Sequence, residues 1–140
     1  MFLLDTNVVS ELRKGKSKAD PQVVAWSDST PAATRYLSAI SILELEIGVI
    51  SMARRDGAQA AMLRSWLDER VLPAFAGRIL PVDQTVAQYC ARLHVPDPRP
   101  ERDALIAATA IIHGMPLVTR NVRDFASLGV TLINPWEPRR

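Results

Sequence analysis

Short apolar runs alternate along the chain with longer segments of helical periodicity. In the longer segments apolar residues recur every three to four positions, as in Leu43, Ile47 and Ile50, which is the spacing of an amphipathic helix. Strands that alternate with such helices indicate a parallel sheet covered on both faces. The pattern predicts an α/β fold, a three-layer α/β/α sandwich with about five parallel strands. The expected strands are Met1–Leu4, Tyr36–Ile40, Ile79–Leu80, Leu117–Val118 and Val130–Ile133.

Four acidic residues, Asp5, Glu44, Asp103 and Asp124, each follow an apolar run or begin the helix after it. Parallel strands bring their carboxyl ends to one edge of the sheet, where open α/β sheets hold their ligands. Carboxylates gathered there repel one another and call for a hard divalent cation such as Mg²⁺ or Mn²⁺. Such a metal lowers the pKa of a bound water and polarises a phosphoryl oxygen. The four residues therefore predict metal-dependent phosphodiester hydrolysis.

Each of the four acids also has a structural explanation. The segment Ser41–Glu44 matches a capping box, and Asn121 followed by Asp124 is a similar helix start. Asp103 falls in the first turn of a helix, where the dipole favours a negative charge by about 0.3–1 kcal/mol. Asp5 can simply end a strand and turn the chain. The catalytic interpretation is supported by the set of four more than by any one member.

Neutral polar residues lie next to these acids in the sequence. Thr6 and Asn7 follow Asp5, while Thr119 and Asn121 follow the Leu117–Val118 strand. Their side chains can orient a carboxylate or a metal-bound water, although helix capping and turn formation are their default roles. They are candidates for a supporting role around the acids.

Two further glutamates are possible members of the site. Glu46 lies about 200° round the helix from Glu44, so the two cannot face one pocket and we expect Glu46 to point outward. Glu11 lies about a turn and a half beyond Asp5 and can approach the cleft. The simpler expectation is that Glu11 is an exposed helical residue beside Lys14.

Composition limits the class of protein. The chain has 140 residues, 48% of them hydrophobic, which suits a single domain spanning residues 1–140. One cysteine, Cys90, excludes a disulfide framework and a thiolate zinc site. No apolar run approaches the ~18 residues that span a bilayer, and the N-terminus has no basic leader region. We therefore expect a cytoplasmic protein without a membrane segment.

The net charge of +2 is small but unevenly distributed. Basic residues gather at Arg13–Lys18, at Arg54 and Arg55, and at Arg139 and Arg140. Such runs permit nucleic-acid binding without demanding it, because a solvated surface has the same composition. No P-loop or dinucleotide-binding glycine motif is present, so the charge does not indicate a nucleotide-cradling loop.

Four segments resemble, in order, the motifs of PIN-domain proteins. They are Leu3–Leu12, Ile40–Gly48, Asp103–Ala110 and Leu117–Phe125. The resemblance extends over almost the whole chain, and it is specific because four motifs coincide. Within that superfamily, the compact chain most resembles the VapC toxins of bacterial toxin–antitoxin pairs, including the FitB-like branch.

The resemblance implies a PIN-like fold, a Mg²⁺- or Mn²⁺-dependent endoribonuclease activity and a homodimer. It also implies a cognate VapB-like antitoxin that wraps the toxin and places a side chain in or near the acidic site. DNA is then bound only indirectly, through the antitoxin. Carried over position by position, Asp5, Glu44, Asp103 and Asp124 become the catalytic and metal-binding acids, and Thr119 becomes the hydroxyl beside them.

The leading hypothesis is a toxin that cuts RNA with a metal-activated water. Asp5 and Asp103 are the expected main metal ligands, with Arg13–Lys18 and either Arg120 or Arg123 on the phosphate backbone. Single-stranded or looped RNA is the expected substrate, because the deep groove of an RNA duplex hides its sequence.

Two alternatives remain open. One is a non-catalytic module whose acidic pocket receives an arginine from another protein, and the other is a DNA nuclease with the same residues. A partner also needs a docking surface, and the apolar stripes in Leu43–Ile50 and Met62–Leu67 are expected to offer one.

Overall fold

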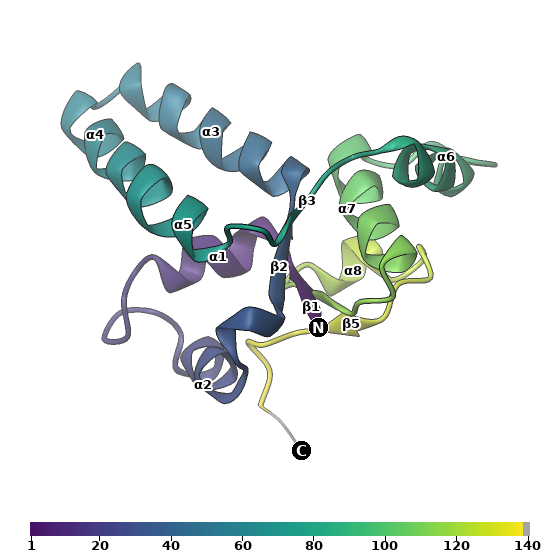
Figure 1. Cartoon of the computed structure of the whole chain (residues 1–140), viewed down its shortest axis with the longest axis horizontal. Helices are drawn as coiled ribbons and strands as arrows, with labels where there is room; N and C mark the ends of the chain where they lie inside the picture. The colour runs from purple at the N-terminus through teal and green to yellow at the C-terminus, as the bar shows by residue number, and fades with distance from the viewer. Residues whose placement is uncertain (139–140) are drawn as a thin grey trace.

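The computed structural model describes residues 1–138, in which five strands form one parallel sheet of order β3-β2-β1-β4-β5 (Figure 1). The predicted parallel α/β sheet is confirmed, and the predicted strand ends differ from the observed ones by at most two residues. The expected basic run at Arg139 and Arg140 lies outside the described residues. The strands are β1 Phe2–Leu4, β2 Arg35–Ser38, β3 Ile79–Leu80, β4 Leu117–Val118 and β5 Leu132–Ile133.

Helices cover both faces of this sheet. The pair α3 and α4 packs side by side and reaches away from the strands, while α6 and α7 pack together on the other side (Figure 1). Within residues 1–138, no helix is long and apolar enough to cross a membrane. The helices are α1 Thr6–Leu12, α2 Pro21–Ser29, η1 Ala32–Thr34, α3 Ala39–Ala53, α4 Gly57–Trp66, η2 Leu67–Val71, α5 Leu72–Ala74, α6 Gln84–Leu93, α7 Glu101–Ile112 and α8 Val122–Phe125.

Alternation along the central strands divides the core into two layers. Successive strand residues point to opposite faces of a sheet. Leu3 and Leu117 pack in a cluster with Phe125 of α8 and residues of α7. Their neighbours Leu4 and Val118 pack in the other cluster, with residues of α1, α2 and α3. The three-layer α/β/α sandwich follows from this arrangement.

The helix α3 begins earlier than the sequence pattern predicts. Strand β2 ends at Ser38, whose hydroxyl accepts a hydrogen bond from the backbone N–H of Ile40 at 3.0 Å and caps the helix. The predicted capping box at Ser41–Glu44 is therefore wrong, because both of its ends lie inside α3. As a result, the Glu44 side chain is available to contact the edge of the sheet.

Candidate active site

Strands β1 and β4 bring two buried polar residues together at the carboxyl edge of the sheet. Asp5 follows β1 and caps α1, where its carboxylate accepts the backbone N–H of Thr6 at 2.8 Å. Thr119 follows β4, and its hydroxyl donates to the other carboxylate oxygen of Asp5 at 2.7 Å. Asp5 is only 5% exposed and Thr119 is fully buried. The structure thus places Thr119 directly beside Asp5.

Glu44 reaches the same edge from α3. The Thr6 hydroxyl lies 2.7 Å from a carboxylate oxygen of Glu44 and 2.9 Å from the Ser41 hydroxyl. A hydroxyl has one proton to give, and a bond to a charged acceptor is the stronger one. Thr6 therefore donates to Glu44 and accepts from Ser41. Arg102 lies 3.7 Å from the other oxygen of Glu44.

Asp103 and Asp124 are held differently from the other two acids. Asp103 lies in the first turn of α7, as predicted, and Asp124 lies in the short helix α8. Burial raises the pKa of the Asp103 carboxyl, the nearby charges of Asp124 and Glu44 raise it further, and Arg102 opposes them. Asp103 is therefore the acid on which the charges of both Glu44 and Asp124 act.

The Asp5 carboxyl also ionises less readily than a free one. Burial is the main cause of its raised pKa, and the charges of Glu44 and Asp103 add to it. The hydrogen bonds from Thr119 and Thr6 act in the opposite direction, because they favour the carboxylate. The site therefore gathers negative charge and compensates only part of it.

Three of the four predicted acids line one open cleft of about 440 Å³, namely Asp5, Glu44 and Asp103. Asp124 does not line this cleft, although its charge acts on Asp103. The cleft is completed by polar and aromatic side chains from α1 and the turn after it, from the segment after β4 and from the C-terminal segment. They are Thr6, Asn7, Ser10, Glu11, Lys14, Arg120, Asn121 and Trp136.

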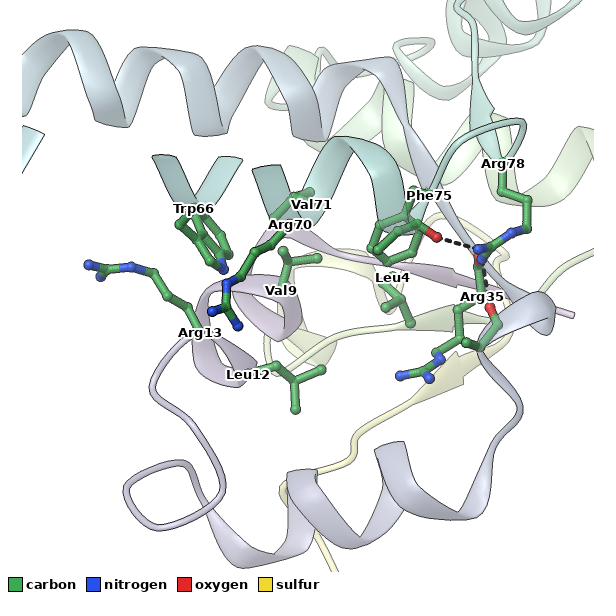
Figure 2. Close-up of a pocket in the computed structure, with 12 residues that line it drawn as sticks. Leu4, Val9, Leu12, Arg13, Arg35, Trp66, Arg70, Val71, Phe75 and Arg78 are labelled. Carbon is green, nitrogen blue, oxygen red and sulfur yellow. Dashed lines mark hydrogen bonds between the residues drawn. The ribbon is translucent and has the colours of Figure 1, made fainter. Parts of the chain in front are cut away.

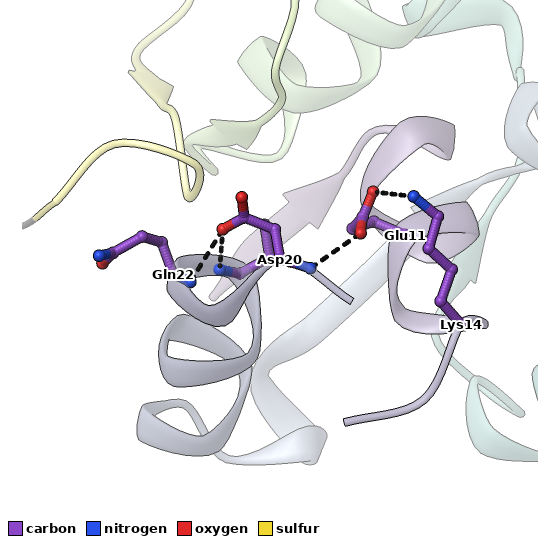
Figure 3. Close-up of polar contacts among 5 residues, drawn as sticks. Glu11, Lys14, Asp20 and Gln22 are labelled. Atoms are coloured by element: carbon purple, nitrogen blue, oxygen red, sulfur yellow. Dashed lines mark hydrogen bonds and ion pairs between the residues drawn. The ribbon is translucent and has the colours of Figure 1, made fainter. Parts of the chain in front are cut away.

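The two further glutamates have structural partners. Glu11 is not the exposed side chain expected from the sequence, since it is only 8% exposed. Its carboxylate accepts hydrogen bonds from Lys14 and from the backbone N–H of Asp20, both at 2.9 Å (Figure 3). The Lys14 bond is the main reason that its pKa is lowered. Glu46 turns away from the cleft as expected, and it pairs with Arg64 of α4 at 2.8 Å.

The sequence reasoning missed two residues of the cleft, Ser10 of α1 and Trp136, which comes shortly after β5. The guanidinium of Arg120 lies 5.3 Å from the centroid of the Trp136 ring. The signal that could have found Trp136 is the rule that located Asp5. The segment after each parallel strand begins at the same edge of the sheet.

The donors of the cleft fit a hard divalent cation. Its carboxylates and hydroxyls offer oxygen ligands, which Mg²⁺ and Mn²⁺ prefer. Within residues 1–138, no three His, Cys, Asp or Glu side chains lie close enough together to enclose an ion by themselves. Mg²⁺ commonly takes one or two protein carboxylates and keeps several waters. The open cleft therefore fits an ion held largely through water.

A second pocket, of about 200 Å³, has an apolar floor and a cationic rim (Figure 2). Four arginines line it, Arg13, Arg35, Arg70 and Arg78, and none of them forms an ion pair with an acid of residues 1–138. Burial and the charge of Arg78 lower the pKa of Arg35. We call this site the arginine pocket. Its apolar lining is Leu4, Val9, Leu12, Ala32, Trp66, Val71, Ala74 and Phe75.

The pair α3 and α4 leaves apolar side chains in solvent. Leu43 is 45% exposed, Ile47 40%, and Ile50 and Met62 each 61%. The expected apolar surface is therefore present on α3. The Met62–Leu67 stripe is divided, because Leu67 is fully buried.

Residues 2–130 match the PIN domain family, and the chain belongs to this family. It is 40% identical to the VapC ribonuclease Y4jK of Sinorhizobium fredii, with 99% of each chain covered. It is 38% identical to the toxin FitB of Neisseria gonorrhoeae, over 97% of this chain and 99% of FitB. The predicted resemblance to the PIN-domain family, its VapC toxins and its FitB-like branch is confirmed.

Solved structures share this fold. The crystal structure of FitAcB from Neisseria gonorrhoeae has a TM-score of 0.88 at 38% identity and covers 99% of this chain and 100% of its own. A toxin–antitoxin complex from Klebsiella pneumoniae has a TM-score of 0.68 at 25% identity, with 99% and 100% covered.

Proposed function

We propose that the chain is the ribonuclease toxin of a toxin–antitoxin pair and hydrolyses RNA phosphodiester bonds with a hard divalent cation. The observation that carries the proposal is the convergence of Asp5, Glu44 and Asp103 on one open, oxygen-lined cleft. The similarity over nearly the full length to a VapC ribonuclease and to the toxin FitB supports it. RNA as the substrate would place the protein in the cytoplasm.

Asp5 and Asp103 would hold Mg²⁺ or Mn²⁺, with Glu44 and Asp124 acting through water or at a second ion. A bound cation would supply a water of lowered pKa and polarise the phosphoryl oxygen. The hydrogen bond from Thr119 favours the ionised form of Asp5, so the hydroxyl keeps this ligand ready for a cation.

Cations at the cleft support RNA as the substrate class. Lys14 and Arg120 line the cleft together with the acids. Lys14 would contact a phosphate beside the cleaved bond, and the charge of Arg120 would help to draw a negatively charged substrate to a negatively charged site. Because such contacts release counterions, the affinity for RNA should fall steeply with salt.

The arginine pocket supports the second half of the proposal, inhibition by an antitoxin. Arg35 and Arg78 repel each other above an apolar floor, and no acid of residues 1–138 pairs with either of them. An apolar segment with acidic side chains would bury the floor and neutralise the rim. The solved FitAcB structure and the Klebsiella pneumoniae toxin–antitoxin complex are consistent with such a partner. DNA would be reached through the antitoxin.

The exposed stripe of α3 supports a homodimer. Leu43, Ile47 and Ile50 lie in solvent at helical spacing. Monomeric proteins rarely leave a contiguous apolar patch uncovered, so a second copy of the chain would bury this face.

The test is cleavage of a mixed RNA pool by the purified chain with Mg²⁺ or Mn²⁺, with EDTA, and with Asp5→Asn. Asp68→Asn is the matched control, because Asp68 is 48% exposed on η2 and does not line the cleft. We expect cutting by the wild type and by Asp68→Asn, and none with EDTA or in Asp5→Asn. Cutting that survives in Asp5→Asn would refute the proposed site. A parallel DNA pool separates an RNA nuclease from a DNA nuclease.

One observation favours a second candidate, a non-catalytic module that receives an arginine. Arg102 lies 3.7 Å from Glu44, so one acid of the cleft already pairs with a guanidinium. Direct Mn²⁺ binding to the free chain distinguishes the two, because an arginine receptor has no need to bind the metal.

A further inference from the structure

Trp136 lies beside the acidic cleft without belonging to the acid set. The residue comes shortly after β5 and lies beyond the residues 2–130 that match the family. Its backbone N–H donates to the side-chain oxygen of Asn134 at 3.0 Å, which fixes the turn that presents the ring. The ring is half-buried, because part of it packs on the core cluster that contains Leu4 and Val118. A flat aromatic surface is thus held at the rim of the cleft.

Arg120 is placed over this ring. The central carbon of its guanidinium lies 5.3 Å from the ring centroid, within the range of a cation–π contact. Its backbone N–H donates to the side-chain oxygen of Asn7 at 3.4 Å, which ties the residue to α1. Arg120 is exposed, and no acid of residues 1–138 forms an ion pair with it. The guanidinium therefore keeps its charge and a solvent-facing side available beside the cleft.

We propose that Arg120 and Trp136 form a nucleobase-stacking subsite, which binds an unpaired base next to the phosphate that lies among the acids. The inference rests on the proposed ribonuclease function and adds a subsite to it. Aromatic rings and guanidinium planes both stack on the faces of bases. A paired base in a duplex has no free face, so this subsite would select single-stranded over double-stranded RNA.

The two residues have separate contributions. Trp136 contributes a π-surface without charge, and Arg120 contributes a plane that also carries charge. Removing the ring should therefore weaken binding without changing its dependence on salt, whereas removing the Arg120 charge should also reduce the salt slope by about one. If Trp136 had only a structural role, removing its ring would weaken the binding of single strands and duplexes alike.

The experiment measures the binding of a labelled RNA oligonucleotide by fluorescence anisotropy. The RNA is either single-stranded or paired with its complement. All protein variants are full chains that also carry Asp5→Asn, which prevents cleavage during the measurement. The variants added are Trp136→Leu, Trp136→Phe, Arg120→Gln and the control Arg54→Gln, which changes the same charge at the exposed end of α3. We expect Trp136→Leu to weaken single-strand binding by about 5- to 150-fold and Trp136→Phe to weaken it less. Duplex binding should change little in either Trp136 variant.

Trp136→Leu could weaken binding by disturbing the fold, so Arg120→Gln provides a second variant of the subsite. Arg120 is exposed and its side chain does not pack in the core, so this substitution should leave the fold intact. It should also weaken single-strand binding more than Arg54→Gln does. Equal affinity of Trp136→Leu and the parent chain for the single strand would overturn the inference, as would equal losses on single strand and duplex. A parent chain that binds no RNA at all would overturn the proposed function as well. RNA cleavage by the wild type alongside unaffected Trp136 variants would overturn the stacking subsite alone.

Discussion

Thr119→Val should reveal how the buried acid Asp5 is kept ionised. Valine has nearly the shape of threonine but lacks the hydroxyl. The change removes the 2.7 Å hydrogen bond to the Asp5 carboxylate, and also the 2.9 Å bond that Thr119 accepts from the backbone N–H of Asn121. Because Asp5 is 5% exposed, water cannot readily replace the lost donor. The fold is expected to lose stability for this reason.

The size of the loss follows from the charge on the acceptor. A hydrogen bond to a charged group contributes about 1.5–3 kcal/mol net, so the free energy of unfolding should fall by about that amount at neutral pH. For a chain of this length the melting temperature should then fall by roughly 5–12 °C. Thr109→Val is the matched control. Thr109 is also fully buried, but its hydroxyl donates to the neutral carbonyl of Leu105 in its own helix at 2.8 Å. We expect it to cost less than about 1 kcal/mol.

The loss should also depend on pH in a defined direction. Burial holds the pKa of Asp5 above its ordinary value, and the bond from Thr119 lowers it again. Without that bond the folded pKa rises further. A carboxyl with a raised folded pKa loses stability as pH rises through that pKa. The cost of Thr119→Val should therefore grow with pH between the Asp5 pKa of the wild type and that of the variant, both above the ordinary value.

Urea unfolding followed by circular dichroism in EDTA, from about pH 4 to about pH 8, measures this directly. Below the raised pKa of Asp5, the cost of Thr119→Val should approach that of Thr109→Val. At high pH the two should separate. Equal costs of the two substitutions at every pH, or a larger cost at low pH, would refute the idea that Thr119 acts on the ionised Asp5.

Asp103→Asn should abolish RNA cleavage while leaving the melting temperature unchanged or higher, because burial and neighbouring acids raise the Asp103 pKa; a clearly lower melting temperature would contradict this. Mn²⁺ at 100 times its dissociation constant should stabilise the wild type by about 2.7 kcal/mol in a thermal melt, and equal stabilisation of Asp5→Asn would exclude Asp5 as a ligand. Glu11→Gln should lower stability at neutral pH. The lowered folded pKa of Glu11 means that this difference should vanish in urea melts as pH falls through it, and a constant difference would refute the assignment.

The parallel-sheet rule explains why Asp5 and Thr119 meet, although before the structure only the resemblance to the PIN-domain family placed Thr119 beside the acids. The two lie 114 positions apart, yet each follows a strand directly, and β1 and β4 are neighbours in the sheet. Glu44 was also expected near this edge, but the local capping pattern around it was misleading. Ser38 and Ser41 both suit a helix start. Only the pairing of Ser38 with Leu80 of β3 assigns Ser38 to the strand and leaves Ser41 inside the helix.

The burial of Glu11 could not be predicted in this way, and the rule places Trp136 at the site only once the strand order is known. Glu11 is buried because the chain turns back after α1 and brings the backbone N–H of Asp20 to its carboxylate. The path of that turn depends on how the whole segment packs, which periodicity does not record. Trp136 belongs to no helix or strand with a recognisable periodicity. Its position beside the acids can be inferred only once β5 is known to be the edge strand next to β4.

The acids of the site differ in what supports their charge, and this difference indicates where a cation should act. Asp5 and Glu44 each accept a hydrogen bond from a threonine hydroxyl. Asp103 has no side-chain donor within residues 1–138, and its main compensation is the nearby charge of Arg102. Among the acids that line the cleft, Asp103 has the least compensation, so a cation in the cleft would gain most beside it. Since a metal ion and a guanidinium would compete for the same uncompensated charge, an arginine from a partner protein and a metal ion should exclude each other there.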